Sequence, residues 1–190
     1  MTLRGFPQRT LRGAHELYRI HRAVNGPWWF SADGSGRFDP VGSGLGACYF
    51  GTVPLGAWVE VFRKQMLLAE ETVLARALFS VALGRDVKLA DVTSRRALEH
   101  GITATLGAGD DYAPSQGFAA QAVAAGFDGV RYFARHDPAQ KLYGIALFGP
   151  AGASDPADPL WPSGSDEHPI PEALVQDAVK RFGYRVLPTP

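Results

Sequence analysis

Four residues in the first third of the chain have side chains that could do chemistry: Arg19, Arg37, Tyr49 and Glu60. Arg37 lies inside the glycine-rich stretch GSGRFDP, and such a stretch either holds a phosphate through its backbone amides or forms a loop with nothing to bind. Each of the other three also has a structural explanation. An arginine in a strand is commonly solvated, a tyrosine between apolar neighbours is commonly core, and a helical glutamate is commonly exposed. The residue types alone leave both interpretations open.

The elements that must position these side chains can be predicted from local patterns. ELYRIHR (16–22) alternates apolar and polar residues and predicts a strand that carries Arg19. Residues 25–46 predict a long irregular segment, which is uncommon in a compact domain unless it lines a site. ACYFG (47–51) predicts a buried strand. A helix is expected to follow, with Thr52 as its cap and Pro54 in its first turn. Its apolar stripe consists of Leu55, Trp58, Val59, Phe62 and Met66, and Glu60 lies at the margin of this stripe.

The remaining sequence predicts further strands and helices without strict alternation, which indicates an α+β fold. The expected strands lie at 73–83, 86–93, 129–135 and 142–149, and the expected helices at 94–101, 115–126 and 171–182. Residues 151–169 are rich in Pro, Ser, Asp and Gly and predict a linker. We therefore expect one main domain over 1–150, and a linker and C-terminal helix over 151–190 that pack on the same domain.

Composition and motifs exclude several common functions. The 19 basic and 19 acidic residues cancel, so direct binding to nucleic acid is not expected. The single cysteine and five histidines form no metal-binding motif, so no metal is expected. GSGLG (42–46) precedes a probable strand rather than a helix, which argues against a dinucleotide-binding fingerprint. There is no apolar run of signal-peptide or membrane-spanning length, which favours a cytoplasmic protein without a membrane partner.

The order of several segments resembles the RES domain, the toxin of many bacterial toxin–antitoxin pairs. The matching stretches are LYRIHR, PWWFSADGSGRFDP, ACYFGTVPLGAWVEVF, APSQGFAAQAVAAGFDGVRYFARHDP and GIALFG, which together cover roughly residues 15–149. The resemblance implies an ADP-ribosyltransferase-like core of short, mostly antiparallel strands with flanking helices. It also implies that NAD is consumed as a substrate, with no further cofactor.

The resemblance also assigns roles to individual residues. It implies catalytic roles for Arg19, Tyr49 and Glu60, and substrate-binding roles for Arg37, Ser115, Gln116, Gly36 and Phe30. Many relatives carry serine in a Y-x-S-R strand, where this chain has Ala134, so the family serine is assigned to the Ser115-Gln116 pair instead. In this scheme Glu60 stabilises the cation that forms on the ribose, and arginines bind the diphosphate.

Three functions remain as alternatives at this stage. The leading one is a toxin that cleaves the nicotinamide–ribose bond of NAD by hydrolysis or phosphorolysis. The others are ADP-ribosylation of a protein and a weakly catalytic module that binds NAD or a partner. The expected partners are NAD and an Xre-like antitoxin, and the chain could also form a homo-oligomer. The sequence does not identify the ribosyl acceptor.

Overall fold

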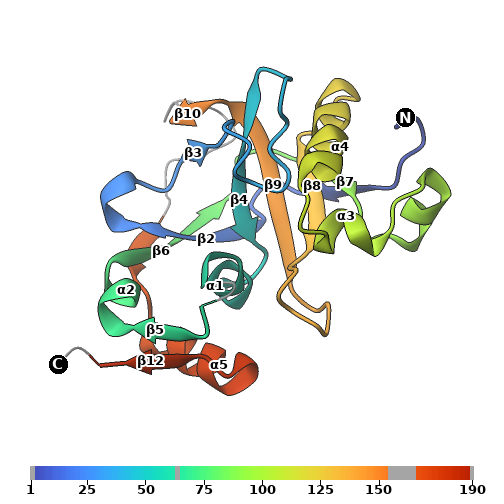
Figure 1. The fold of residues 1–190 in the computed structure, drawn as a ribbon. Helices are drawn as coiled ribbons and strands as arrows, with labels where there is room; N and C mark the ends of the chain where they lie inside the picture. The colour runs from blue at the N-terminus through green and yellow to red at the C-terminus, as the bar shows by residue number, and fades with distance from the viewer. Residues whose placement is uncertain (1–2, 63–64, 154–165, 189–190) are drawn as a thin grey trace.

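The computed structural model describes residues 3–62, 65–153 and 166–188, and its main feature is a mixed eight-stranded sheet (Figure 1). All neighbouring strands pair antiparallel except β7 and β8, which are parallel. The order across the sheet is β1 (Gln8–Leu11), β7 (Val87–Asp91), β8 (Gly129–Phe133), β9 (Tyr143–Pro150), β4 (Leu45–Gly51), β2 (Glu16–Arg22), β6 (Arg76–Ala82) and β11 (Asp166–Pro169).

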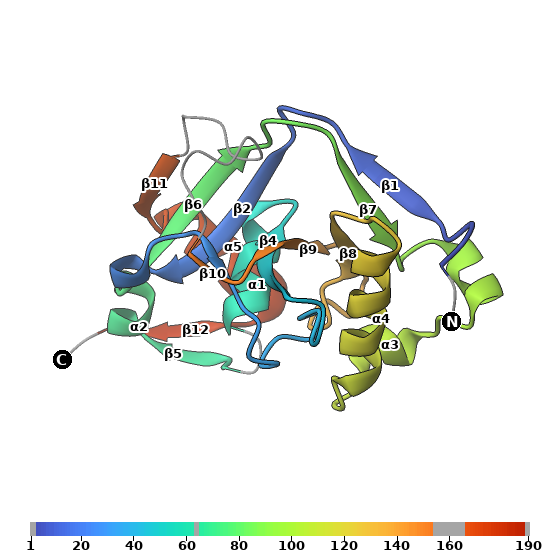
Figure 2. The same cartoon turned by 90° about the horizontal axis from the view of Figure 1, so that it is seen from above.

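The sheet consists of two arms that are joined narrowly. β2 and β4 pair through one register position, Tyr18 with Gly51, whereas β2 and β6 pair along seven positions. A second connection lies where β1 turns into β2 and β6 turns into β7. There Ala14 N donates to Leu83 O, and Leu83 N donates to His15 O. Figure 2 shows β2 with β6 and β1 with β7 diverging from these turns. One arm consists of β1, β7, β8, β9 and β4, and the other consists of β2, β6 and β11. We call this arrangement a fork, and we call the place where β2 pairs with β4 its base.

Short elements and helices cover both arms. The two small sheets are β3 (Trp29–Phe30) with β10 (Gly152–Ala153), and β5 (Leu67–Ala69) with β12 (Arg185–Leu187). The α-helices are α1 (Pro54–Phe62), α2 (Glu70–Leu74), α3 (Ala104–Ala108), α4 (Ala113–Ala124) and α5 (Glu172–Phe182), and the 3-10 helices are η1 (Ala23–Asn25) and η2 (Arg95–His100).

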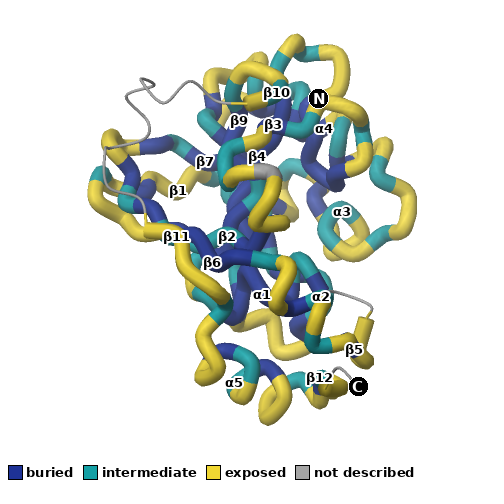
Figure 3. Tube along the Cα trace, turned by 90° about the vertical axis from the view of Figure 1, so that its left-hand side faces the viewer, coloured by how far each residue is buried: buried dark blue, intermediate teal, exposed yellow. Residues whose placement is uncertain are grey.

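The core has three clusters of buried side chains. One lies between the arms and contains Leu17, Phe50 and Phe79. A second joins α4 to β7, β8 and β9. The third packs α1 against β2, β6 and α5 around Trp58, which is fully buried. Figure 3 shows α1 as largely buried, while β5, β12 and much of α5 are exposed. Each large buried side chain contributes roughly 1.5–3 kcal/mol, so this packing fixes α1 against the base of the fork.

The α+β prediction is confirmed, and most predicted elements are present with shifted ends. The segment 73–83 is not a single strand, because its first residues belong to α2. The helix α2 begins at Glu70, and Glu70 and Glu71 lie in its first turn, where acidic side chains are favourable. Met66 is exposed and lies outside α1, so it does not continue the apolar stripe.

The segment 151–169 is not only a linker. β10 pairs with β3, and β11 pairs with β6. The part of the predicted linker at 154–165 lies outside the described residues. After it, α5 packs on α1, and the rings of Tyr184 and Trp58 meet edge to face at 5.7 Å.

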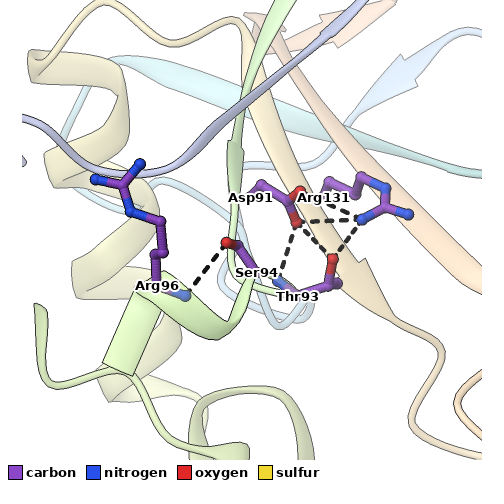
Figure 4. Close-up of polar contacts among 5 residues, drawn as sticks. All are labelled: Asp91, Thr93, Ser94, Arg96 and Arg131. Atoms are coloured by element: carbon purple, nitrogen blue, oxygen red, sulfur yellow. Dashed lines mark hydrogen bonds and ion pairs between the residues drawn. The ribbon is translucent and has the colours of Figure 1, made fainter. Parts of the chain in front are cut away.

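A polar network holds the parallel pair β7–β8 (Figure 4). Arg131 Nη1 donates to both carboxylate oxygens of Asp91, at 3.2 and 3.3 Å, and to Thr93 Oγ1. Ser94, which follows, accepts the backbone N–H of Arg96 and caps η2. The network thus fixes the start of the segment that leads through η2 to α3.

Candidate functional site

The base of the fork brings three of the predicted catalytic residues together. Arg19 comes from β2, Tyr49 from β4 and Glu60 from α1, and all three line one cleft of about 440 Å³, here termed the outer cleft. The three meet because β2 and β4 separate after the Tyr18–Gly51 pair and because α1 follows β4 directly.

Arg37 lies on the other side of Glu60. It lines a smaller cavity of about 30 Å³ together with Tyr49, Glu60 and Tyr112, here termed the inner cavity. Its guanidinium carbon lies 4.4 Å from the centroid of the Tyr112 ring, and its Nη1 donates weakly to Leu106 O at 3.4 Å. Arg37 is buried, and its Nη2 has no hydrogen-bond partner within the described residues. A buried guanidinium with an unused donor is suited to bind an oxygen of a ligand.

Opposing effects act on the pKa of Arg37. Burial lowers the pKa of its guanidinium, the electrostatic interactions with Tyr112 and Glu60 raise it, and the positive charge of Arg135 lowers it. Glu60 itself is half-buried on the border of the α1 stripe, as its position in the sequence predicts. Glu60 and Tyr49 therefore belong to both cavities, whereas Arg19 and Arg37 approach them from different sides.

The glycine-rich stretch is organised around Asp39, whose side chain is completely buried. The carboxylate accepts hydrogen bonds from Ser31 Oγ at 2.9 Å, Gly36 N at 2.9 Å and Tyr49 Oη at 2.8 Å. Tyr49 Oη in turn accepts the backbone N–H of Phe38 at 2.9 Å. Burial raises the pKa of the Tyr49 phenol well above its usual value, and the charge of Asp39 raises it further. Tyr49 is therefore a neutral, fixed hydrogen-bonding group at ordinary pH.

Gly36 is required by this arrangement. A Cβ at this position would lie 2.3 Å from both Asp39 Oδ1 and Tyr49 Oη. Its N–H already donates to Asp39, so Gly36 has a structural role here, and its contact with a substrate stays a prediction. The glycine-rich stretch thus positions Arg37 through its internal hydrogen bonds, and the amides of residues 36 and 38 are not left for a phosphate.

Arg19 has an unusual environment on β2. Its Nη1 lies 2.7 Å from the sulfur of Cys48, and its buried Nε has no hydrogen-bond partner within the part of the chain described. Burial raises the pKa of the Cys48 thiol, and the charge of Arg19 acts against this effect. The guanidinium is therefore fixed by a weak acceptor and keeps donors for a ligand in the outer cleft.

The other predicted substrate-binding residues lie around the site. Gln116 Nε2 donates to Gly34 O at 2.8 Å and to Gly36 O at 3.0 Å, so it holds the glycine-rich stretch against α4. Ser115 is buried, and its Oγ donates to Tyr112 O, which fixes the first turn of α4. Its contact with a substrate stays a prediction.

Phe30 lies in the core. Its ring is only 2% exposed and packs between the arms, over Gly149, while Gly46 lies close to its backbone carbonyl group. Gly149 leaves the space that the ring fills, and a contact of Phe30 with a substrate stays a prediction. Ala134, at the position where relatives carry serine, is buried beside the α1 cluster.

Sequence reasoning missed several residues that line or hold the site. Asp39 lies two residues after Arg37 in the same Gly/Pro segment, and an acid there was a usable signal. No local pattern in the sequence marks five further residues that line the two cavities. They are Arg76 in the outer cleft and Tyr112, Tyr132, Arg135 and His136 in the inner cavity.

Two further observations limit the chemistry of the described residues. Nowhere in them do three or more His, Cys, Asp or Glu side chains gather closely enough to hold a metal ion. In the same ranges, no helix has the length and apolar character needed to cross a membrane.

Comparisons with known proteins agree with this architecture. The RES domain family model matches residues 16–166, which is most of the chain, and the chain therefore belongs to the RES domain family. Its fold is similar to that of a chain in the crystal structure of the M. tuberculosis MbcT–MbcA toxin–antitoxin complex. That likeness has a TM-score of 0.64 and 22% sequence identity, and it covers 88% of this chain and 90% of the other. No curated protein matches the sequence.

Proposed function

We propose that this chain is the toxin of a toxin–antitoxin pair and that it cleaves the nicotinamide–ribose bond of NAD. The observation that carries the proposal is the position of Glu60, which lines two cavities that both also contain Tyr49 and two buried or half-buried arginines. Membership of the RES domain family and the similarity to a toxin–antitoxin structure support the same conclusion.

The proposed reaction breaks the bond between the anomeric carbon of ribose and the ring nitrogen of nicotinamide. The electron pair goes to that nitrogen, so nicotinamide leaves as a neutral molecule and positive charge develops on the sugar. The Glu60 carboxylate stabilises this charge more in the transition state than in the ground state, which lowers the barrier. Water or phosphate then forms the new bond to the anomeric carbon and loses its proton.

The neighbouring groups position the dinucleotide for this step. Arg19 donates to the diphosphate in the outer cleft, since a guanidinium matches phosphate oxygens with two parallel hydrogen bonds. Tyr49 presents a ring face to the cationic nicotinamide, and its hydroxyl is held by Asp39. Arg37, with its unused Nη2, binds a substrate oxygen on the inner side of Glu60.

Product analysis tests the proposal directly. Purified protein is incubated with NAD, and released nicotinamide is measured by chromatography. Glu60→Gln is expected to lower the rate about 10²–10³-fold, as for the loss of one well-placed electrostatic group. Glu99→Gln, the same change on an exposed surface residue of η2, is the matched control. Full activity of Glu60→Gln would remove Glu60 from the mechanism.

The same experiment separates the alternatives. With NAD labelled on the adenylate, label on ADP-ribose or its phosphate supports degradation, whereas label on a protein supports ADP-ribosyl transfer. Intact NAD after prolonged incubation would overturn catalysis and leave a binding module. We further propose an Xre-like antitoxin as the partner, which is expected to abolish nicotinamide release when added in equal amount.

A further inference from the structure

A second cleft continues the outer cleft along β2. It has a volume of about 490 Å³ and is lined by Arg19, His21, Arg22, Trp29 and Arg76, and it is here termed the distal cleft. Arg19, Ile20 and Arg76 line both clefts, so the two form one continuous depression that leads away from Glu60. A molecule with its reacting bond at Glu60 can therefore extend into the distal cleft.

The distal cleft concentrates positive charge. Arg22 and Arg76 are register partners across β2 and β6, which places their side chains next to each other on one face of the sheet. Burial lowers the pKa of Arg76, and the positive charge of Arg22 lowers it further. His21, which lines the same cleft, has Glu167 Oε2 at 3.4 Å from its Nε2.

Several arginines elsewhere in the fold form ion pairs. A carboxylate lies within 3.2 Å of each of five guanidinium groups, those of Arg12, Arg85, Arg131, Arg135 and Arg181. Within the described residues, no such ion pair involves Arg19, Arg22 or Arg76, and Arg76 instead lies over the Phe62 ring at 5.4 Å. Three arginines that line one cleft without an ion-paired carboxylate indicate a site for a bound anion.

An exposed aromatic ring completes the distal cleft. Trp29 is 55% exposed, whereas Trp58 is fully buried in the core. β3 holds Trp29 in place through its pairing with β10, where Trp29 lies opposite Ala153. An exposed indole next to guanidinium groups offers a stacking surface to a flat heteroaromatic base.

We propose that the distal cleft binds the adenosine diphosphate part of the dinucleotide, with phosphates at Arg19, Arg22 and Arg76 and the adenine on Trp29. This assignment rests on the proposed function for the identity of the whole substrate. Size favours this orientation, because the distal cleft has a volume of about 490 Å³, whereas the inner cavity has about 30 Å³.

Binding of ADP tests the assignment without relying on turnover. Calorimetric titration with ADP is expected to show binding that weakens about tenfold in Arg22→Ala, the loss of one charge-assisted contact, and about tenfold in Trp29→Ala, the loss of one stacking contact. Both side chains are exposed, and thermal unfolding verifies that the variants fold. Arg181→Ala, which removes an ion-paired arginine on α5, is expected to bind within twofold of the unmodified protein.

Kinetics provide the second measurement. Nicotinamide mononucleotide lacks the adenylate, so the ratio of kcat/KM for NAD to that for the mononucleotide is expected to fall about tenfold in Arg22→Ala and Trp29→Ala. Equal losses for both substrates would overturn the assignment.

The two proposals fail in different ways. ADP binding that depends on Arg22 and Trp29, without any nicotinamide release, would remove the proposed reaction and keep the nucleotide site. Nicotinamide release by a protein that does not bind ADP, or whose Arg22→Ala and Trp29→Ala variants bind ADP unchanged, would remove the nucleotide site and keep the reaction.

Discussion

The inner cavity and the distal cleft each share residues with the outer cleft, and they differ in how their polar groups are satisfied. Around the inner cavity, the carboxylate of Asp39 accepts three hydrogen bonds, and Gln116 donates two to the glycine-rich stretch. In the distal cleft, Arg22 and Arg76 lie side by side, and no carboxylate within the described residues forms an ion pair with either of them.

The polar groups around the inner cavity therefore stabilise the structure of the site, whereas the arginines of the distal cleft are available to bind a ligand. A buried hydrogen-bonded cluster is set before a substrate arrives, and its loss affects folding. Neighbouring positive charges near solvent contribute little to the free energy of folding. Their favourable interaction forms only when an anion binds to them. Substitutions should therefore reduce stability on the inner side and ligand binding on the distal side.

The largest effect on stability is expected for Asp39→Ala. The change leaves the Tyr49 hydroxyl and the Gly36 N–H without their common acceptor at a buried position, while the Ser31 hydroxyl keeps Asp33 as an acceptor. We expect a loss of about 3 kcal/mol in the free energy of unfolding, measured by denaturant titration. A loss below about 0.5 kcal/mol would contradict the view that this cluster holds the inner side.

Gly36→Ala is expected to have a somewhat smaller effect. The added methyl group would meet Asp39 and Tyr49 at 2.3 Å, and overpacking of this kind costs about 2 kcal/mol. Gly117→Ala in α4 is the matched control, since nothing lies within 4 Å of the added carbon and alanine favours a helix by roughly 0.5–1 kcal/mol. Opposite shifts of Tm in the two variants confirm the prediction, and shifts of the same sign reject it.

Arg22→Ala is expected to change the free energy of unfolding by less than about 0.5 kcal/mol, because the side chain is exposed and has no ion-pair partner within the described ranges. Arg131→Ala provides the contrast. Its guanidinium holds Asp91 and Thr93 and is only 16% exposed, so we expect a loss of about 2 kcal/mol. Chemical denaturation of both variants measures the difference, and a large loss for Arg22→Ala would assign it a structural role.

The smallest effect concerns Asp33, which directly precedes the glycine-rich stretch. Hydrogen bonds from the side chain and backbone of Ser35, and then from Ser31, lower its pKa from 3.8 to about 2. Because the folded-state pKa is depressed, the stabilisation is complete above pH 3.8 and is lost as the pH falls toward 2. The Tm difference between the unmodified protein and Asp33→Asn should therefore shrink over this range. A difference that stays constant with pH would reject the effect.

The sequence predicts the local parts of this site better than its long-range parts. The period of the apolar residues in 54–62 correctly puts Glu60 at the edge of the α1 stripe, and the alternation in 16–22 correctly predicts the strand of Arg19. Both patterns are short-range, so the neighbouring residues are sufficient to determine them.

Other features depend on contacts between distant segments. Arg76 lies beside Arg22 only because of the β2–β6 register, and Asp39 is buried only because β4 brings Tyr49 over it. The ring of Phe30 fits in the core because Gly149, more than a hundred residues away, leaves room for it. No local pattern encodes such pairings, so the distal cleft and the function of the glycine-rich stretch were not predictable.

β11 has a consequence for the behaviour of the protein at high concentration. It covers the free edge of β6, whose outward-facing backbone groups would otherwise be available to pair with another chain. β11 itself is short and exposed and carries Asp166, Glu167, His168 and Pro169, a composition that discourages further strand addition. The C-terminal segment thereby protects the sheet from edge-to-edge aggregation.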